Sequence, residues 1–228
     1  MPLPAIILAA GRGERLRPLT DHTPKPLLKV RGKPLIEYHL EALAAAGVAQ
    51  VVINTAWLEE QFPAALGDGS RWGLQIRYSM EGREHGGALE TAGGIAKALP
   101  WLGDCFWVVS GDVHLPRFDF DPASSDRFVA GDRLAQLWLV PNPPHHPEGD
   151  FAIDPCGLAL TDRQPRRTWA SVGLFRAEMF RSVVSGTRLP LRPLLFDAAA
   201  RQRLGALPWD GGWTDVGTLE RLAEAERA

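Results

Sequence analysis

A glycine-rich segment near the start of the chain has the residue types that bind phosphate. Residues 8–20 have the sequence LAAGRGERLRPLT, in which Arg15 follows Gly11 and Gly13 at regular spacing. Glycines let a backbone approach a phosphate closely and expose N–H groups to it. The planar guanidinium of Arg15 can hold two phosphate oxygens at once. Lys25 stands between two prolines, which restrict the backbone and limit where its ammonium group can point.

The same glycines do not fit two common phosphate-binding motifs. The dinucleotide-binding fingerprint needs a third Gly or Ala three positions after Gly13, and that position holds Leu16. A Walker A loop ends in Gly-Lys-Ser or Gly-Lys-Thr, which this segment lacks. An ordinary strand-to-helix turn would need neither Arg15 nor the Pro-Lys-Pro around Lys25. The segment therefore predicts a phosphate-binding loop of another kind.

Two aspartates are candidate ligands for Mg²⁺. Asp112 ends a Ser-Gly-Asp sequence just after the apolar run 106–109, and Asp215 lies in a turn framed by Trp and Gly. Mg²⁺ takes oxygen ligands and keeps several waters, so one or two carboxylates plus substrate phosphates suffice. Asp215 could instead cap the final helix, a role that Thr218 could also fill. The residues alone leave both roles of Asp215 open.

Strands that alternate with short helices must position these residues. The hydrophobic pattern predicts strands over 4–8, 51–53, 74–78 and 106–109, and helices over 34–47, 58–66 and 91–99. Such alternation predicts βαβ units, and therefore an α/β fold with a mainly parallel sheet. Ligands of parallel sheets bind outside the carboxyl ends of the strands. Because Gly11 and Asp112 each follow a strand, we expect them at one crevice.

Composition and charge exclude several classes of partner. The 25 basic and 27 acidic residues give a net charge of −2, which argues against broad binding to nucleic acid or to an anionic membrane. The start of the chain lacks the pattern of a signal peptide. Cys105 and Cys156 form no CxxC pair and are expected to be free thiols. His145 and His146, adjacent in a Pro-rich loop, indicate exposed surface rather than a metal site. We expect a cytoplasmic protein.

Four segments together resemble the sugar-1-phosphate nucleotidyltransferases. They are the glycine-rich segment, the Pro-Lys-Pro after it, Gly111-Asp112 and the WTDVGT sequence at 213–218. The resemblance implies a Rossmann-like, mainly parallel sheet flanked by helices, of the GT-A-like type, with a small β-rich lid that binds sugar. It also implies that a sugar phosphate attacks the α-phosphate of a nucleoside triphosphate and that pyrophosphate leaves. Catalysis would then be positioning and charge neutralisation by Arg15, Lys25 and Mg²⁺. Asp112 and Asp215 would hold the metal.

The resemblance also implies the residues that bind the nucleotide. They are Ala10, Gly11, Gly13, Arg15, Lys25, Glu81, Thr91 and Asp112. A carboxylate at Glu81 can accept the N3–H of uracil or thymine, and this favours UTP. The alternative is that Glu81 and Glu90 are solvated loop charges.

Within the family, the sequence closely resembles the N-acetylmuramate α-1-phosphate uridylyltransferases of cell-wall recycling, in segments such as 34–40, 67–71 and 215–226. This implies UTP and that sugar phosphate as substrates, with sugar contacts at Asn142, Gly149, Asp150 and Ser171. Many hexose-1-phosphate members carry Glu-Lys-Pro in the lid, whereas residues 162–167 have the sequence DRQPRR. We hypothesise that Arg166 or Arg167 meets the lactyl carboxylate. A solvated basic loop is the alternative.

The resemblance implies one nucleotidyltransferase domain over residues 1–228. About residues 1–140 would form the nucleotide-binding core, about 141–190 the sugar-binding lid, and about 191–228 the closing helices with Asp215. Two other functions stay open. One is the same reaction with another sugar and base, such as mannose 1-phosphate with GTP. The other is a non-catalytic sensor of a nucleotide sugar, which would be expected to lack one of the charged residues that this chain retains.

Overall fold

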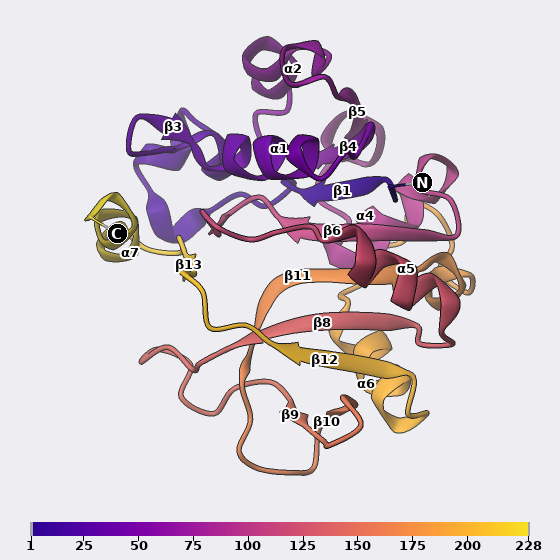
Figure 1. Ribbon diagram of the computed structural model, residues 1–228. Coiled ribbons are helices and arrows are strands. Elements are labelled where there is room, and N and C mark those ends of the chain that lie inside the picture. The colour runs from indigo at the N-terminus through magenta and orange to yellow at the C-terminus, as the bar shows by residue number, and fades with distance from the viewer. Residues whose placement is uncertain (1, 228) are drawn as a thin grey trace.

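The central sheet has seven strands in the order β12-β8-β11-β6-β1-β4-β5 (Figure 1). The computed structural model describes residues 2–227. The seven strands are β1 (Ala5–Leu8), β4 (Gln50–Thr55), β5 (Gln75–Met80), β6 (Cys105–Ser110), β8 (Ala135–Val140), β11 (Thr168–Arg176) and β12 (Leu204–Pro208). β6, β1, β4 and β5 are parallel neighbours, as are β8 and β12, and β11 runs antiparallel between β6 and β8. The sheet is mainly parallel, which confirms the α/β prediction.

The middle strands are buried on both faces. Ile6 of β1 pairs with Val52 of β4 on one side and with Val108 of β6 on the other. Each of these side chains is at most 1% exposed. Parallel strands covered by helices on both faces consist of nearly continuous apolar residues. This is why the strand pattern at the start of the chain was apolar rather than alternating.

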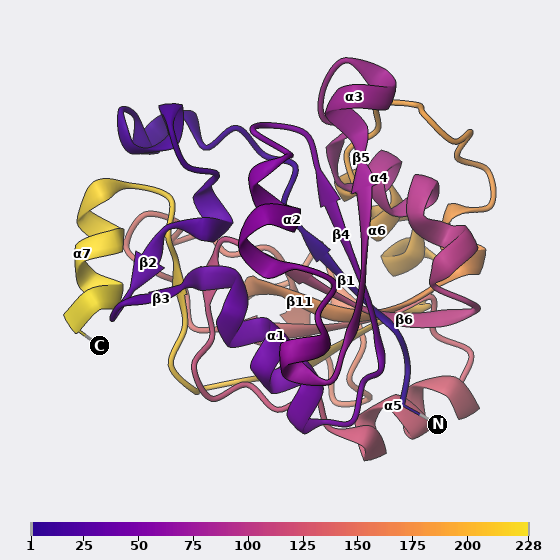
Figure 2. The same ribbon diagram turned by 90° about the horizontal axis from the view of Figure 1, so that it is seen from above.

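Helices form a layer on each face of the sheet (Figures 1 and 2). The α-helices of the described residues are α1 (Leu35–Ala45), α2 (Gln61–Leu66), α3 (Glu81–His85), α4 (Glu90–Ala98), α5 (Pro122–Ala130), α6 (Arg192–Ala200) and α7 (Leu219–Arg227). One apolar cluster joins Leu40 of α1 to Ile7 on one face, and a second joins Ile95 of α4 to Ile6 on the other. α1 follows Pro34, and Gly47, with φ +78°, lies just past its end. This placement of proline and glycine is the one that favours helix boundaries.

Short two-stranded ladders lie outside the main sheet. They are β2 (Lys29–Val30) with β3 (Lys33–Pro34), β7 (Val113–His114) with β13 (Thr214–Asp215), and β9 (Ala152–Ile153) with β10 (Ala159–Leu160). In the β7–β13 ladder Asp215 lies opposite Val113, and the Val216 N–H donates to the Asp112 carbonyl oxygen at 3.0 Å. α7 packs beside β2 (Figure 2). These contacts bring the C-terminal segment to the carboxyl end of β6.

The structure differs from the expected internal division in two places. β11 lies within residues 141–190, yet it is an inner strand of the main sheet and not part of a lid. β12 lies within residues 191–228, which were expected to hold the closing helices and Asp215, and forms an edge of the sheet. Both strands pair with β8. Between β8 and β11, the turns and the short strands β9 and β10 lie outside the main sheet. Among the described residues, no helix is long and apolar enough to cross a membrane.

His39 on α1 predicts a pH dependence of stability. Its ring is 2% exposed, and Nε2 lies 2.9 Å from the Val113 carbonyl oxygen. Burial lowers the pKa of His39 from 6.5 to about 4, so folding favours the neutral ring. The stabilisation is therefore complete above pH 6.5 and is lost as the pH falls toward 4. Urea unfolding should show wild type losing about 2 kcal/mol more than His39→Gln between about pH 7.5 and about pH 5. Equal losses in both proteins would contradict this prediction.

Candidate active site

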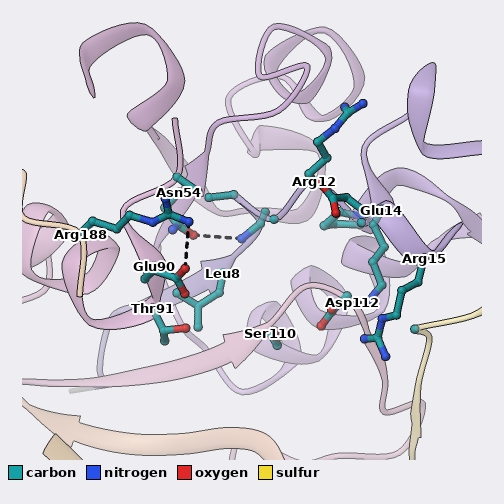
Figure 3. Close-up of a pocket in the computed structure, with 18 residues that line it drawn as sticks. Leu8, Arg12, Glu14, Arg15, Asn54, Glu90, Thr91, Ser110, Asp112 and Arg188 are labelled. Atoms are coloured by element: carbon teal, nitrogen blue, oxygen red, sulfur yellow. Dashed lines mark hydrogen bonds and ion pairs between the residues drawn. The ribbon is translucent and has the colours of Figure 1, made fainter. Parts of the chain in front are cut away.

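A cavity of about 570 Å³ lies at the carboxyl ends of β1, β4 and β6 (Figure 3). Its walls come from the glycine-rich loop after β1, from Asn54 on β4, from Ser110 and Asp112 at the end of β6, and from the first turn of α4. Arg188 and Gly217 complete the lining from far along the chain. The cavity thus lies at the edge of the sheet that the strand pattern predicted.

The glycine-rich loop folds over Lys25. Gly13 has φ +69°, a left-handed conformation that favours glycine. A Cβ there would lie 3.0 Å from Thr20 Cγ2 and 3.2 Å from Lys25 Cβ. The Thr20 hydroxyl donates to the Gly13 carbonyl oxygen at 2.9 Å. At Gly11, in contrast, a Cβ would meet no heavy atom within 4 Å, so the backbone there is open to the cavity.

Lys25 and Asp112 form an ion pair on the cavity wall. Lys25 is 8% exposed, and its Nζ donates to Asp112 Oδ2 at 2.6 Å. Burial alone would raise the pKa of Asp112, but the charge and hydrogen bond of Lys25, with help from Ser110, hold it below its usual value. The site therefore pairs a buried ammonium with an ionised carboxylate. Arg15 also lines the cavity, on the same side as Asp112 (Figure 3).

Asp215 lies next to Asp112 through the β7–β13 ladder, but its side chain lines a neighbouring cavity of about 460 Å³. Its Oδ1 is buried and accepts no hydrogen bond from the described residues. His145 Nε2 lies 3.1 Å and Arg221 Nη1 lies 3.3 Å from this oxygen. The Arg221 N–H donates to Thr218 Oγ1 at 3.3 Å, so Thr218 caps α7 and Asp215 does not.

Asp112 and Asp215 offer oxygen atoms of the kind that Mg²⁺ prefers. The Asp112 side chain is 35% exposed and ionised at neutral pH, and Asp215 Oδ1 has unused hydrogen-bonding capacity. Mg²⁺ prefers hard oxygen ligands and takes the rest of its shell from phosphates and water. An ionised carboxylate and a carboxylate oxygen that accepts no hydrogen bond from the described residues, on segments joined by the β7–β13 ladder, are oxygen donors of the kind that such an ion takes.

Glu81 lies behind the cavity wall, not at its surface. It is 0% exposed, and its Oε1 accepts from Asn54 Nδ2 at 2.7 Å. Its Oε2 accepts from the Leu89 N–H at 2.7 Å. Burial raises the pKa of Glu81, although these hydrogen bonds act against the rise. Glu81 therefore does not line the cavity. It orients Asn54, whose Oδ1 accepts from the Ala9 N–H at 2.9 Å.

The residues expected at the sugar do not line the 570 Å³ cavity. Asn142 Nδ2 donates to the Pro147 and Arg166 carbonyl oxygens, and its Oδ1 accepts from Thr168 Oγ1 at 2.9 Å. Gly149 packs against it, since a Cβ there would lie 2.6 Å from Asn142 Oδ1. The Asn142 side chain thus holds the lid together.

Asp150 is also engaged by its own chain, whereas Ser171 lies in β11 of the main sheet. Asp150 accepts from the Trp169 N–H at 2.8 Å and lies 3.2 Å from His146 Nε2. Ser171 has φ +59° in the irregular part of β11 where the pairing register with β8 shifts.

The lid arginines and histidines also have partners. The Arg166 guanidinium donates to the Thr161 and Arg163 carbonyl oxygens, and Arg167 pairs with Asp210. Neither arginine lines the 570 Å³ cavity. His145 and His146 are each 40% exposed, as expected, but each pairs with an aspartate. The pairing of His145 with Asp215 had no signal in the local sequence.

Other expected residues line the cavity, and Asn54, Arg188 and Gly217 are among the lining residues that were missed. Ala10, Gly11, Gly13, Arg15, Lys25, Thr91 and Asp112 all contribute to its wall. Asn54 was missed, although it ends a predicted strand at the same sheet edge. Gly217 belongs to the WTDVGT sequence, whereas Arg188 belongs to no motif and is brought in by the tertiary fold.

Two known proteins are similar in sequence to this chain over nearly its whole length. N-acetylmuramate alpha-1-phosphate uridylyltransferase of Neisseria meningitidis serogroup B is 49% identical over 226 residues, covering 97% of this chain and 96% of that protein. UTP--glucose-1-phosphate uridylyltransferase of Synechocystis sp. is 41% identical over 98% of this chain and 62% of its own length.

A crystal structure from Bacillus anthracis, described as a glucose-1-phosphate thymidylyltransferase with sucrose, shares the fold. Its TM-score is 0.82 at 23% identity, and the match covers 98% of this chain and 94% of that one. The sequence profile described as Nucleotidyl transferase matches residues 4–149. With more than half of its length matched by that profile and a close relative over nearly all of it, the chain belongs to the nucleotidyl transferase family.

Proposed function

We propose that this protein transfers a uridylyl group from UTP to N-acetylmuramate α-1-phosphate and releases pyrophosphate. The observation that carries the proposal is the Lys25–Asp112 pair, 2.6 Å long, in a cavity whose wall includes the glycine-rich loop. A cation and an ionised carboxylate at the carboxyl ends of parallel strands suit a nucleoside triphosphate with its metal ion. The Neisseria relative supports the choice of base and sugar.

The chain's own residues would stabilise charge during the transfer. A phosphate oxygen of the sugar 1-phosphate attacks the α-phosphorus of UTP. The bond from that phosphorus to the oxygen bridging the β-phosphate breaks, and pyrophosphate leaves with the electron pair. The nucleophile is already anionic, so no general base is needed. Lys25 and Arg15 would neutralise charge on the phosphates, while the loop at Gly11 and Gly13 positions them.

The proposal includes Mg²⁺, held by Asp112 and Asp215. When bound, the ion would supply Lewis-acid neutralisation of phosphate charge. Lys25 keeps Asp112 ionised and therefore ready to act as a ligand. Arg221 and His145 lie beside Asp215 and fix the position of its carboxylate.

The lid would position the sugar, with Asn142 and Gly149 acting through the shape of its loop and with Asp150 and Ser171 nearby. N-acetylmuramate is a cell-wall sugar, so we also propose a role in cell-wall recycling in the cytoplasm. The printed name of the Neisseria relative supports the sugar, and the lack of a Glu-Lys-Pro sequence in the lid leaves room for its lactyl group.

A pyrophosphate-release assay over a panel of nucleoside triphosphates and sugar 1-phosphates tests the substrate assignment. We expect the highest kcat/KM with UTP and N-acetylmuramate α-1-phosphate, and dependence on Mg²⁺. N-acetylglucosamine 1-phosphate is the matched control because it lacks only the lactyl group. Turnover confined to GTP with mannose 1-phosphate would overturn the substrates, and no turnover with any pair would leave the sensor as the better account.

A further inference from the structure

The end of the cavity farthest from Asp112 is bounded by an ion pair between Glu90 and Arg188 (Figure 3). Arg188 Nη2 lies 3.2 Å from Glu90 Oε1, although 98 positions separate the two residues in the chain. Glu90 begins α4, and Arg188 belongs to the segment that precedes α6. In Figure 3 both lie across the cavity from Arg15 and Asp112.

The segment that carries Arg188 is fixed on the first turn of α4. The Leu189 carbonyl oxygen accepts from the Ala92 N–H at 3.0 Å and from the Gly93 N–H at 3.1 Å. A Cβ at Gly93 would lie 2.2 Å from the Thr187 carbonyl oxygen, so only glycine permits this approach. The backbone of Arg188 is therefore held in place, even though its side chain is 73% exposed.

Glu90 has an unusual backbone conformation. Its φ is +61°, in the left-handed region, where a residue other than glycine is strained. Such strain is tolerated mainly where the position of a side chain serves a function. Glu90 lines the cavity and its side chain is 45% exposed, so its carboxylate is accessible to a ligand.

The positions of the charges fix which end of a nucleotide would lie here. Gly13, Lys25 and Asp112 provide the phosphate end, so the nucleoside must extend toward Glu90 and Arg188. Glu81 is not available to a base because it is 0% exposed and its carboxylate faces Asn54 and the Leu89 N–H inside the protein. A carboxylate accepts hydrogen bonds only, and a guanidinium donates only.

We infer that Glu90 and Arg188 together recognise the imide edge of the nucleobase. Glu90 accepts the N3–H of uracil, and Arg188 donates to the adjacent carbonyl oxygen. This inference rests on the proposed function and names the residues that select its nucleotide. Cytosine has an acceptor at N3 and an amine at C4. The Glu90 carboxylate would then face another acceptor, and the Arg188 guanidinium would face another donor. Guanine carries the same N–H beside a carbonyl. The pair therefore favours uracil and guanine over cytosine and adenine.

Titration calorimetry of UTP and CTP, without any sugar phosphate, tests the inference apart from turnover. We expect wild type to bind UTP about 30-fold more tightly than CTP. In Glu90→Gln the amide can donate to cytosine N3, and the preference for UTP over CTP should fall to about threefold or less. Arg188→Ala should weaken UTP binding about tenfold and leave CTP binding nearly unchanged.

The matched control is Arg71→Ala, which removes an ion pair with Glu37 (2.8 Å) outside the residues that line the cavity. It should keep the wild-type ratio. If both cavity variants keep that ratio while wild type turns UTP over, the inference is overturned and the proposed function is not. If wild type binds no nucleoside triphosphate, the proposed function is overturned, and this inference with it.

Discussion

Replacing Lys25 by methionine is expected to lower kcat/KM for UDP-sugar formation by about 10³-fold. Lys25 lies 2.6 Å from Asp112 on the cavity wall and is 8% exposed. Its removal takes away a fixed cation and leaves the Asp112 carboxylate facing the triphosphate without a partner. Methionine has a similar length and no charge, so the loss reports on charge rather than on space. Steady-state pyrophosphate release over a range of UTP concentrations measures it.

The control for this change is Lys29→Met, because Lys29 is exposed on β2 in the same part of the chain. Its activity should stay within about twofold of wild type. Thermal unfolding of both variants shows whether the fold is kept. If Lys25→Met keeps its fold and more than about a tenth of wild-type kcat/KM, the role given to Lys25 fails.

Replacing Asp112 by asparagine is expected to lower kcat by about 10²- to 10³-fold and to remove the benefit of Mg²⁺. Asparagine keeps the shape and can still accept from Lys25, so the fold should survive. UTP binding without metal should stay equal or become tighter, because a negative charge leaves the phosphate end of the cavity. Added Mg²⁺ should tighten UTP binding in wild type and not in this variant.

The matched control is Asp119→Asn, since Asp119 is exposed and lies shortly after Asp112 in the chain. Its metal response should equal that of wild type. Calorimetry measures how UTP affinity changes with Mg²⁺ concentration, and the activity assay measures how turnover changes. Together they separate the effect of Asp112 on metal-dependent UTP binding from its effect on kcat. If Asp112→Asn shows the wild-type increase of UTP affinity with Mg²⁺, Asp112 does not hold the metal.

The first half of the fold could be predicted because its signals are local. β1, β4 and β6 are short apolar runs, and the Pro and Gly at the ends of α1 mark its boundaries. Gly11 and Asp112 each follow such a strand directly, so the rule for parallel sheets placed both at one crevice. The cavity at these strand ends agrees with that prediction.

The later strands could not be assigned in this way. β8 has the apolar sequence AQLWLV, which is a strand signal, but β11 pairs antiparallel with it and with β6 across long sequence separations. Sequence order does not reveal such pairings, and so β11 was placed in a lid and β12 among helices. The lid is accordingly smaller than expected.

At the site itself, the directions of the side chains could not be predicted from the sequence. Glu81 begins α3, and the direction of its side chain depends on Asn54 and on the lack of a side chain at Gly94. A Cβ at Gly94 would lie 2.6 Å from both Glu81 Oε1 and Asn54 Nδ2. Arg188 reaches the cavity only because its segment is fixed on α4, which no local motif signals.

The central claim is that the α-phosphate of UTP is transferred to a sugar 1-phosphate. The most direct measurement uses UTP labelled with ³²P at the α-position, together with N-acetylmuramate α-1-phosphate and Mg²⁺, and separates the products. The account predicts that the label enters the UDP-sugar and that the pyrophosphate is unlabelled. Label in free UMP alone, or no transfer of label to any sugar 1-phosphate, would contradict it.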